Sequence, residues 1–252
     1  IGSAVRPLDC SRTLAALRDD ESVRAVVLNI DSPGGSAVGS DLIAQALIRL
    51  RQRKPVIAFI GGLGASGGYM IAAAADGIIA LPSALVGAIG VIAYRPMVEG
   101  ALDRLGVRMR VAKSGVLKDM FSPFREATAE ERGKEQHIID SLHDLFVAGV
   151  ARGRSMSEER VRALATGEVY PTQDALANGL IDRVGDIEDA VDWAVARSDA
   201  PRRVRLVRSR RSLRDLALGR ASTLVAGALG LDAEAGLLGG PLALYDGRLP
   251  LR

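Results

Sequence analysis

Cysteine and histidine are nearly absent from this sequence of 252 residues, and their scarcity excludes several kinds of site. Cys10 is the one cysteine, so the chain can form neither an internal disulfide nor a cysteine-rich metal site. The only histidines, His137 and His143, both fall in a helical pattern over residues 127–152. A place on the helix surface suits them better than a catalytic triad. We expect no metal and no other cofactor.

Aromatic residues make up only 4% of the chain, and none lies among the arginines of its most basic segment. That segment, residues 201–214, holds seven arginines and no acidic residue. Such a run attracts anionic lipid head groups or nucleic acid, but recognition of single strands also uses aromatic stacking. We therefore expect contact with a membrane surface, or a solvated linker, and no nucleic-acid partner.

The first residues contain no methionine, basic region or apolar signal segment, so we expect an upstream segment to have been removed. The composition changes after residue 198, first to arginine and then to small apolar residues. We predict a folded domain over residues 1–198 and a separate C-terminal extension, basic and then apolar, over residues 199–252.

Residues 55–75 carry no charge and are numerous enough to cross a bilayer. Ser66 lies at the centre of this run, among five glycines at positions 61, 62, 64, 67 and 68. Each glycine costs a helix about 1 kcal/mol relative to alanine, and a spanning helix must satisfy its whole backbone. A buried strand, a glycine-rich turn and a buried helix are therefore favoured over a membrane-spanning hairpin.

Short apolar runs alternate with helical patterns along most of the chain. Strands are predicted at residues 24–30, 56–60, 76–80 and 107–112, with a further apolar element beginning at residues 91–92. Helices are predicted at residues 37–52, 69–75, 97–105, 127–152, 171–177 and 187–196, and one more begins at Ser157. This alternation indicates an α/β fold with a mostly parallel sheet, whose ligand sites collect at the carboxyl ends of strands.

Residues 64–68 match G-x-S-x-G, the nucleophile elbow of α/β-hydrolases. That fold places the serine directly after its strand, whereas here several residues separate the predicted strand end at Ile60 from Ser66. A serine can also be activated by a lysine whose amine is kept neutral by burial. Lys113 and Lys118 are the candidates, and Lys118 has the more apolar sequence neighbours.

Acyl transfer also needs two backbone amides that stabilise the oxyanion. Gly67 offers one amide, at the start of the helix that follows Ser66. The turn containing Gly34 and Gly35 offers the second, since glycine tolerates the backbone conformations that hold an amide outward. Each glycine turn taken alone is consistent with an ordinary structural loop.

Five motifs in register resemble the signal peptide peptidase A family, also called protease IV. They are NIDSPGGS, GASGGYMIA, VGAIGV, KSGVLKDMFSPFR and GEVYPTQDALANGLID, at residues 29–36, 64–72, 86–91, 113–125 and 167–182. The resemblance implies a ClpP/crotonase-like fold of repeated strand-strand-helix units and a serine endopeptidase that degrades remnant signal peptides. It also implies Ser66 as nucleophile, Lys118 as general base, and amides at Gly67 and the Gly34–Gly35 turn as the oxyanion hole.

Members of this family assemble into oligomers on the membrane, so the resemblance implies a homo-oligomer whose sites are shared between subunits. Its implied location is the bacterial or archaeal cytoplasmic membrane, with a soluble catalytic domain and an anchor absent from this chain. The chain departs from the family at Ala88, where a serine commonly hydrogen-bonds the catalytic lysine. We expect retained, weaker activity, with Ser114, Ser122 or a water as the substitute.

Two other functions are compatible with the same residues. Crotonase-type acyl-CoA enzymes have a segment similar to residues 61–80, although they use an acidic residue near the oxyanion hole and do not need KSGxxKD. A catalytically weak scaffold of the same fold is the other alternative, because of Ala88.

Overall fold

The computed structural model describes residues 5–207 and 242–246. The chain divides into two compact units. Unit 1 combines residues 1–90 with residues 146–252, and unit 2 is formed by residues 91–145. The long helix α5, Ala129–Arg154, contributes its first part to unit 2 and its last turns to unit 1.

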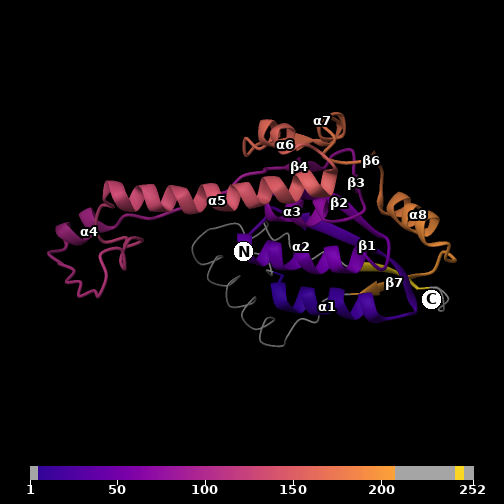
Figure 1. The fold of residues 1–252 in the computed structure, drawn as a ribbon, viewed down its shortest axis with the longest axis horizontal. Helices are drawn as coiled ribbons and strands as arrows, with labels where there is room; N and C mark the ends of the chain where they lie inside the picture. Colours follow the sequence, from indigo (N-terminus) through magenta and orange to yellow (C-terminus); the bar gives the residue numbers. More distant parts are fainter. Residues whose placement is uncertain (1–4, 208–241, 247–252) are drawn as a thin grey trace. The chain divides into compact units, whose positions relative to one another are not determined.

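A mixed sheet forms the centre of unit 1 (Figure 1). Its strands are β1 (Val23–Ser32), β2 (Val56–Ala65), β3 (Gly77–Ala80), β4 (Leu85–Gly87), β5 (Val169–Pro171), β6 (Arg183–Val184), β7 (Val204–Val207) and β8 (Leu242–Asp246). β2 runs parallel to β1, β3 and β4, and β3 runs parallel to β6. β5 pairs antiparallel with β4, and β8 pairs antiparallel with β1 and β7. The predicted α/β class is confirmed, and parallel pairing is found around β2 while antiparallel strands lie at both edges.

β2 continues to Ala65, well beyond the end predicted at Ile60. Its first half pairs with β3 and its second half with β4, where Ala65 lies opposite Gly87. β1 pairs along the other edge of β2 as far as Gly64. These two neighbours supply a hydrogen-bonding ladder that outweighs the weak strand propensity of glycine. The glycine-rich segment is therefore mostly strand, and the turn begins only at Ser66.

Helices cover the two faces of the sheet with separate apolar cores. The larger core packs alternate residues of β1, such as Val26 and Leu28, against α1, α2, α3 and the last turns of α5. The other face packs Ala25 and Val27 against α8. Figure 1 shows α1 and α2 side by side, and the two helices contact each other. The helices are α1 (Pro7–Asp19), α2 (Ala37–Arg51), α3 (Gly67–Ala73), α6 (Glu158–Leu164), α7 (Thr172–Ala177) and α8 (Ile187–Ser198).

The uncharged run of residues 55–75 lies inside unit 1 as β2 and α3, so the alternative of a membrane-spanning hairpin is wrong. Most of its side chains are buried in the two cores. Among the residues that the structure describes, no helix combines the length and apolar character needed to cross a membrane. The predicted N-cap at Ser157 is confirmed, since its hydroxyl accepts a hydrogen bond from the Arg160 amide at 3.1 Å.

Unit 2 contains the short helix α4 (Glu99–Arg104) and the first part of α5. The strand predicted at residues 107–112 is wrong, and residues 91–92 begin neither a helix nor a strand. Val107, Met109 and Val111 alternate with arginine as in a strand, yet all three are exposed. A strand needs a neighbour for its backbone hydrogen bonds, and none of the described strands pairs with this segment.

The C-terminal extension contributes β7 and β8 to the sheet of unit 1. Arg205 of β7 also forms an ion pair with Asp20, at 3.1 Å, next to the end of α1. The described strands of the predicted extension therefore pair with the sheet of unit 1. The rest of the predicted extension, residues 208–241 and 247–252, lies outside the described residues.

Alanine substitutions at two glycines of α5 should change stability in opposite directions. A methyl group on Gly153 would lie 1.9 Å from the carbonyl oxygen of Ala73, whereas one on Gly149 would meet no atom within 4 Å. Gly153→Ala should lower the free energy of unfolding by about 1–3 kcal/mol through overpacking. Gly149→Ala should raise it by about 0.5–1 kcal/mol through helix propensity. Urea unfolding measures both, and shifts of the same sign would contradict the packing of α5 on α3.

Candidate active site

Ser66 occupies a sharp turn between β2 and α3. It is the N-cap residue of α3, with φ 50° and ψ −122°, a backbone conformation that non-glycine residues rarely adopt. Its amide donates to the carbonyl of Gly87 at 2.8 Å, and its carbonyl accepts from the amide of Met70 at 2.9 Å. Backbone strain of this kind is held in place by surrounding structure and gathers at functional sites. The sequence predicted several residues between the end of the strand and Ser66, which argued against a nucleophile elbow. This prediction is wrong, because β2 ends immediately before Ser66.

The turn after β1 packs directly against Ser66. Gly34 has φ +107°, and a methyl group there would lie 2.6 Å from Cβ of Ser66 and 3.0 Å from its Oγ. It would also lie 3.0 Å from the amide nitrogen of Gly67. Only glycine satisfies both the backbone angle and this close approach. The structure therefore brings the two predicted glycine turns together around the serine.

Two of the three predicted oxyanion-hole amides are available to a substrate. The Gly34 amide donates to Oγ of Ser32 at 3.1 Å, so it already has an acceptor. Within the described residues, the amides of Gly35 and Gly67 donate to no acceptor. A methyl group on Gly67 would lie 3.5 Å from the Gly35 nitrogen, which shows how near the two residues are. Ser32 thus holds the turn, and Gly35 with Gly67 are the candidate donors.

Ala88 lies beside the same turn. β4 pairs with β2 so that Gly87 faces Ala65, and the Gly87 carbonyl accepts the amide of Ser66. Ala88 follows with φ 48°, and its amide donates to the carbonyl of Glu168 at 2.7 Å. The position where a serine was expected is therefore held next to Ser66 by strand pairing, and it presents only a methyl group.

Tyr69 anchors α3 in the core, and the sequence did not predict this role. Its side chain is fully buried, and its hydroxyl donates to the carbonyl of Leu180 at 2.8 Å. Burial raises the pKa of this phenol, so it remains a hydrogen-bond donor. Its place immediately after the glycine pair in GASGGY is the sequence feature that could have identified it.

Lys118, Ser114 and Ser122 belong to unit 2. Lys118 is exposed, so the described residues of unit 2 do not give it the burial expected from its apolar sequence neighbours. Val116 and Phe121 are themselves 76% and 55% exposed, because nothing within unit 2 covers them. Ser114 is exposed, and Oγ of Ser122 accepts the amide of Phe124 at 3.3 Å.

The structure distinguishes the two candidate lysines. The ammonium of Lys113 donates to Asp119 Oδ1 at 2.6 Å and to the carbonyl of Val116 at 2.8 Å. No hydrogen bond or ion pair joins the Lys118 ammonium to any described residue. Lys113 thus shapes the loop that carries Lys118, and of the two candidates only Lys118 has an amine without a partner among the described residues.

A network of charges continues from Asp119 to the start of α5. Arg125 contacts Asp119 and donates to Glu131 Oε2 at 2.8 Å, while Glu131 also accepts the amide of Thr128 at 2.8 Å. The hydrogen bond from Arg125 lowers the pKa of Glu131 to about 2, and hydrogen bonds from Arg125 and Lys113 lower the pKa of Asp119. The network is therefore fully charged at neutral pH. The pattern Thr128-x-x-Glu131 is a capping box that sequence reasoning could have found.

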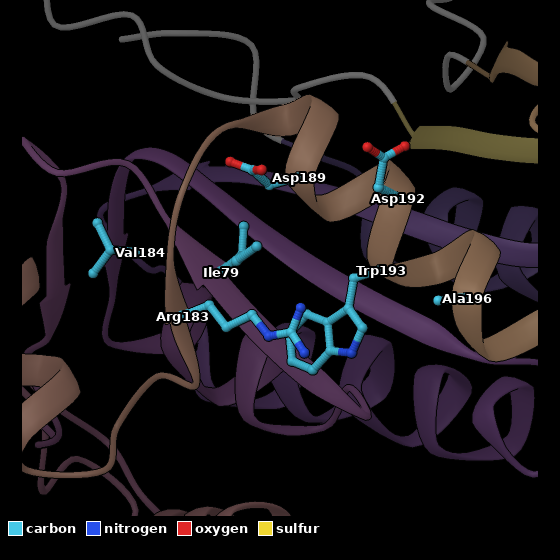
Figure 2. A pocket seen from close by; sticks show the side chains of 7 residues that line it. All are labelled: Ile79, Arg183, Val184, Asp189, Asp192, Trp193 and Ala196. Carbon is cyan, nitrogen blue, oxygen red and sulfur yellow. The ribbon is translucent and has the colours of Figure 1, made fainter.

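A cavity of about 310 Å³ lies on the opposite face of the sheet, against α8. Its lining includes Ile79, Arg183 and Trp193, and the guanidinium of Arg183 lies 4.1 Å from the centre of the Trp193 ring. Figure 2 shows the Arg183 side chain extended along this ring. None of the predicted site residues lines the cavity, and α3 packs on the other face of the sheet.

Comparison with known proteins agrees with the motifs. The family model described as Peptidase family S49 matches residues 48–200. "Putative protease MJ0651" of Methanocaldococcus jannaschii is 39% identical over 175 residues, which cover 69% of this chain and 56% of that protein. "Putative signal peptide peptidase SppA" of Enterococcus faecium is 38% identical over 180 residues, 71% of this chain and 52% of that protein.

"Protease 4" of Haemophilus influenzae is 37% identical over 187 residues, 73% of this chain and 30% of that protein. The chain thus spans about half the length of the first two relatives and less of the third. The family model covers most of the sequence and includes both Ser66 and Lys118. Together with identities well above 30% over more than two thirds of the chain, this match shows that the chain belongs to peptidase family S49.

Proposed function

We propose that the chain is a serine endopeptidase in which Ser66 is the nucleophile and Lys118 the general base. The observation that carries the proposal is the turn at Ser66, where a strained serine lies against the Gly34 turn and beside the free amides of Gly35 and Gly67. Membership in a peptidase family supports the same chemistry. It also disfavours the acyl-CoA alternative, which the sequence left open.

Each residue has one role in the proposed reaction. Oγ of Ser66 attacks the peptide carbonyl while the neutral amine of Lys118 accepts the hydroxyl proton. The amides of Gly35 and Gly67 donate to the oxyanion of the tetrahedral intermediate. Lys118 then gives its proton to the leaving amine, and a water, activated by the same lysine, hydrolyses the acyl-enzyme. No metal or cofactor takes part.

The exposure of Lys118 within unit 2 supports a proposal that a second copy of the chain completes its environment. Burial of an amine against apolar side chains favours its neutral form, which can accept a proton. Unit 2 exposes several large apolar side chains, among them Ile92, Tyr94 and Leu105, which are 70%, 86% and 76% exposed. Apolar surface of this kind is typical of interfaces. We propose a homo-oligomer in which association buries this surface and lets Lys118 serve a site shared between subunits.

The proposed substrates are apolar peptides such as remnant signal peptides. The name of the Enterococcus faecium relative supports this choice. The proposed location is the cytoplasmic membrane of a bacterium or archaeon, with the catalytic domain outside the bilayer. The arginines of residues 201–214 would favour contact with anionic lipid head groups.

Substitution of the two proposed catalytic residues should abolish activity. Ser66→Ala and Lys118→Ala should each lower kcat/KM for an apolar peptide by about 10³-fold or more. A fluorophosphonate should label the unsubstituted protein at Ser66, as mass spectrometry would show. Full activity of Ser66→Ala would disprove the mechanism, and an active Lys118→Ala beside an inactive Lys113→Ala would show that the base is misassigned.

Mixing the two inactive variants provides the control for shared sites. If subunits exchange and each site uses a neighbour's lysine, a mixture of Ser66→Ala and Lys118→Ala chains should regain part of the activity. A mixture that exchanges subunits and stays inactive would show that serine and lysine act within one chain.

Gly34→Ala should lower activity by more than the strain at its positive φ alone would cause. Its methyl group would lie 2.6 Å from Cβ of Ser66, and displacing the nucleophile by about 1 Å costs about 10²-fold in kcat/KM. Gly106→Ala is the matched control, because Gly106 also has a positive φ, +71°, but no atom lies within 4 Å of its added methyl group. Equal activity losses in the two variants would contradict the packing of the turn on Ser66.

Ala88→Ser should raise activity, because it restores a hydroxyl beside Ser66 that can orient the lysine amine. One such hydrogen bond is worth about 1 kcal/mol, or roughly 5-fold in kcat/KM. If Ser114 or Ser122 currently substitutes, its replacement by alanine should lower activity in the parent chain but not in Ala88→Ser. Unchanged or reduced activity of Ala88→Ser would show that the lysine needs no partner at this position.

A further inference from the structure

Ser40 of α2 lies against Gly67, one of the two residues with a candidate oxyanion-hole amide. Its side chain is buried, with 7% of its surface exposed. A methyl group on Gly67 would lie 2.1 Å from Oγ of Ser40 and 3.5 Å from the amide nitrogen of Gly35. The hydroxyl therefore lies against Gly67, on the side from which the Gly35 turn also approaches.

The hydroxyl of Ser40 has no hydrogen-bond partner among the described residues. Its backbone amide makes an ordinary helical bond to the carbonyl of Ser36 at 2.9 Å, so helix formation does not need the side chain. The side-chain oxygen keeps some access to solvent, so a substrate group can reach it. A hydroxyl that has no partner among the described residues, next to the amides of Gly35 and Gly67, can take its acceptor from the substrate.

We infer that the Ser40 hydroxyl is a third donor of the oxyanion hole, beside the amides of Gly35 and Gly67. It donates a hydrogen bond to the substrate carbonyl oxygen as this becomes negatively charged, and it keeps its proton throughout. This role rests on the proposed function, since it presupposes attack by Ser66. A small residue at position 67 is then required, because any side chain there would occupy the place of the hydroxyl.

The kinetics of two variants of Ser40 test the inference. Ser40→Ala should lower kcat by about 10²-fold, with KM changed less than about 2-fold, because only the transition state loses a hydrogen bond. Ser40→Cys nearly preserves the side-chain volume but is a weak donor, so it should resemble Ser40→Ala. The rate of fluorophosphonate labelling at Ser66 should fall in parallel in both variants.

Ser157→Ala is the control for stability. It removes a hydroxyl that caps α6 and should lower the melting temperature while leaving kcat unchanged. Wild-type kcat in Ser40→Ala, or full recovery in Ser40→Cys, would overturn the inference, the second result by showing that the side chain acts only through packing. Absence of labelling in the unsubstituted protein would instead disprove the proposed function itself.

Discussion

The close approach of the Gly34 turn to Ser66 is the contact on which the candidate site depends. Parallel pairing of β1 with β2 brings the ends of both strands to one place, and an irregularity between Ile30 and Ser32 shifts the register just before the turn. Nothing larger than hydrogen fits at position 34. This contact brings the strained backbone of Ser66 next to Gly34 and Gly67, the residues of the two glycine turns.

Two kinds of force organise the two units. In unit 1 the apolar cores on both faces of the sheet hold β2 and α3, so that the position of Ser66 is fixed by packing. In unit 2 almost nothing is buried, and the segment that carries Lys118 is shaped by ion pairs linking Lys113, Asp119 and Arg125. Ion pairs that face water contribute little stability each. The position of the segment that carries Lys118 therefore depends on polar contacts within unit 2 and not on an apolar core.

Much of the fold could be predicted from periodicity, because most strands and helices of unit 1 carry clear apolar patterns. The errors occurred where local pattern and tertiary context disagree. Because glycines follow Ile60, the sequence predicted that the strand ends there. Pairing with neighbouring strands extends β2 to Ala65. The alternating pattern of residues 107–112 predicted a strand, but no described strand is available to pair with it.

The sequence by itself determined the family, the residue types of the site and the choice of Ser66, because these depend on motifs that lie close together along the chain. Only the tertiary structure decided that the Gly34 amide already has an acceptor, that Lys113 is held by Asp119 and that the hydroxyl of Ser40 lies against Gly67. Each of these facts depends on which atoms meet when strands and helices pack. Periodicity reports which face of an element is buried, but it does not report what that face touches.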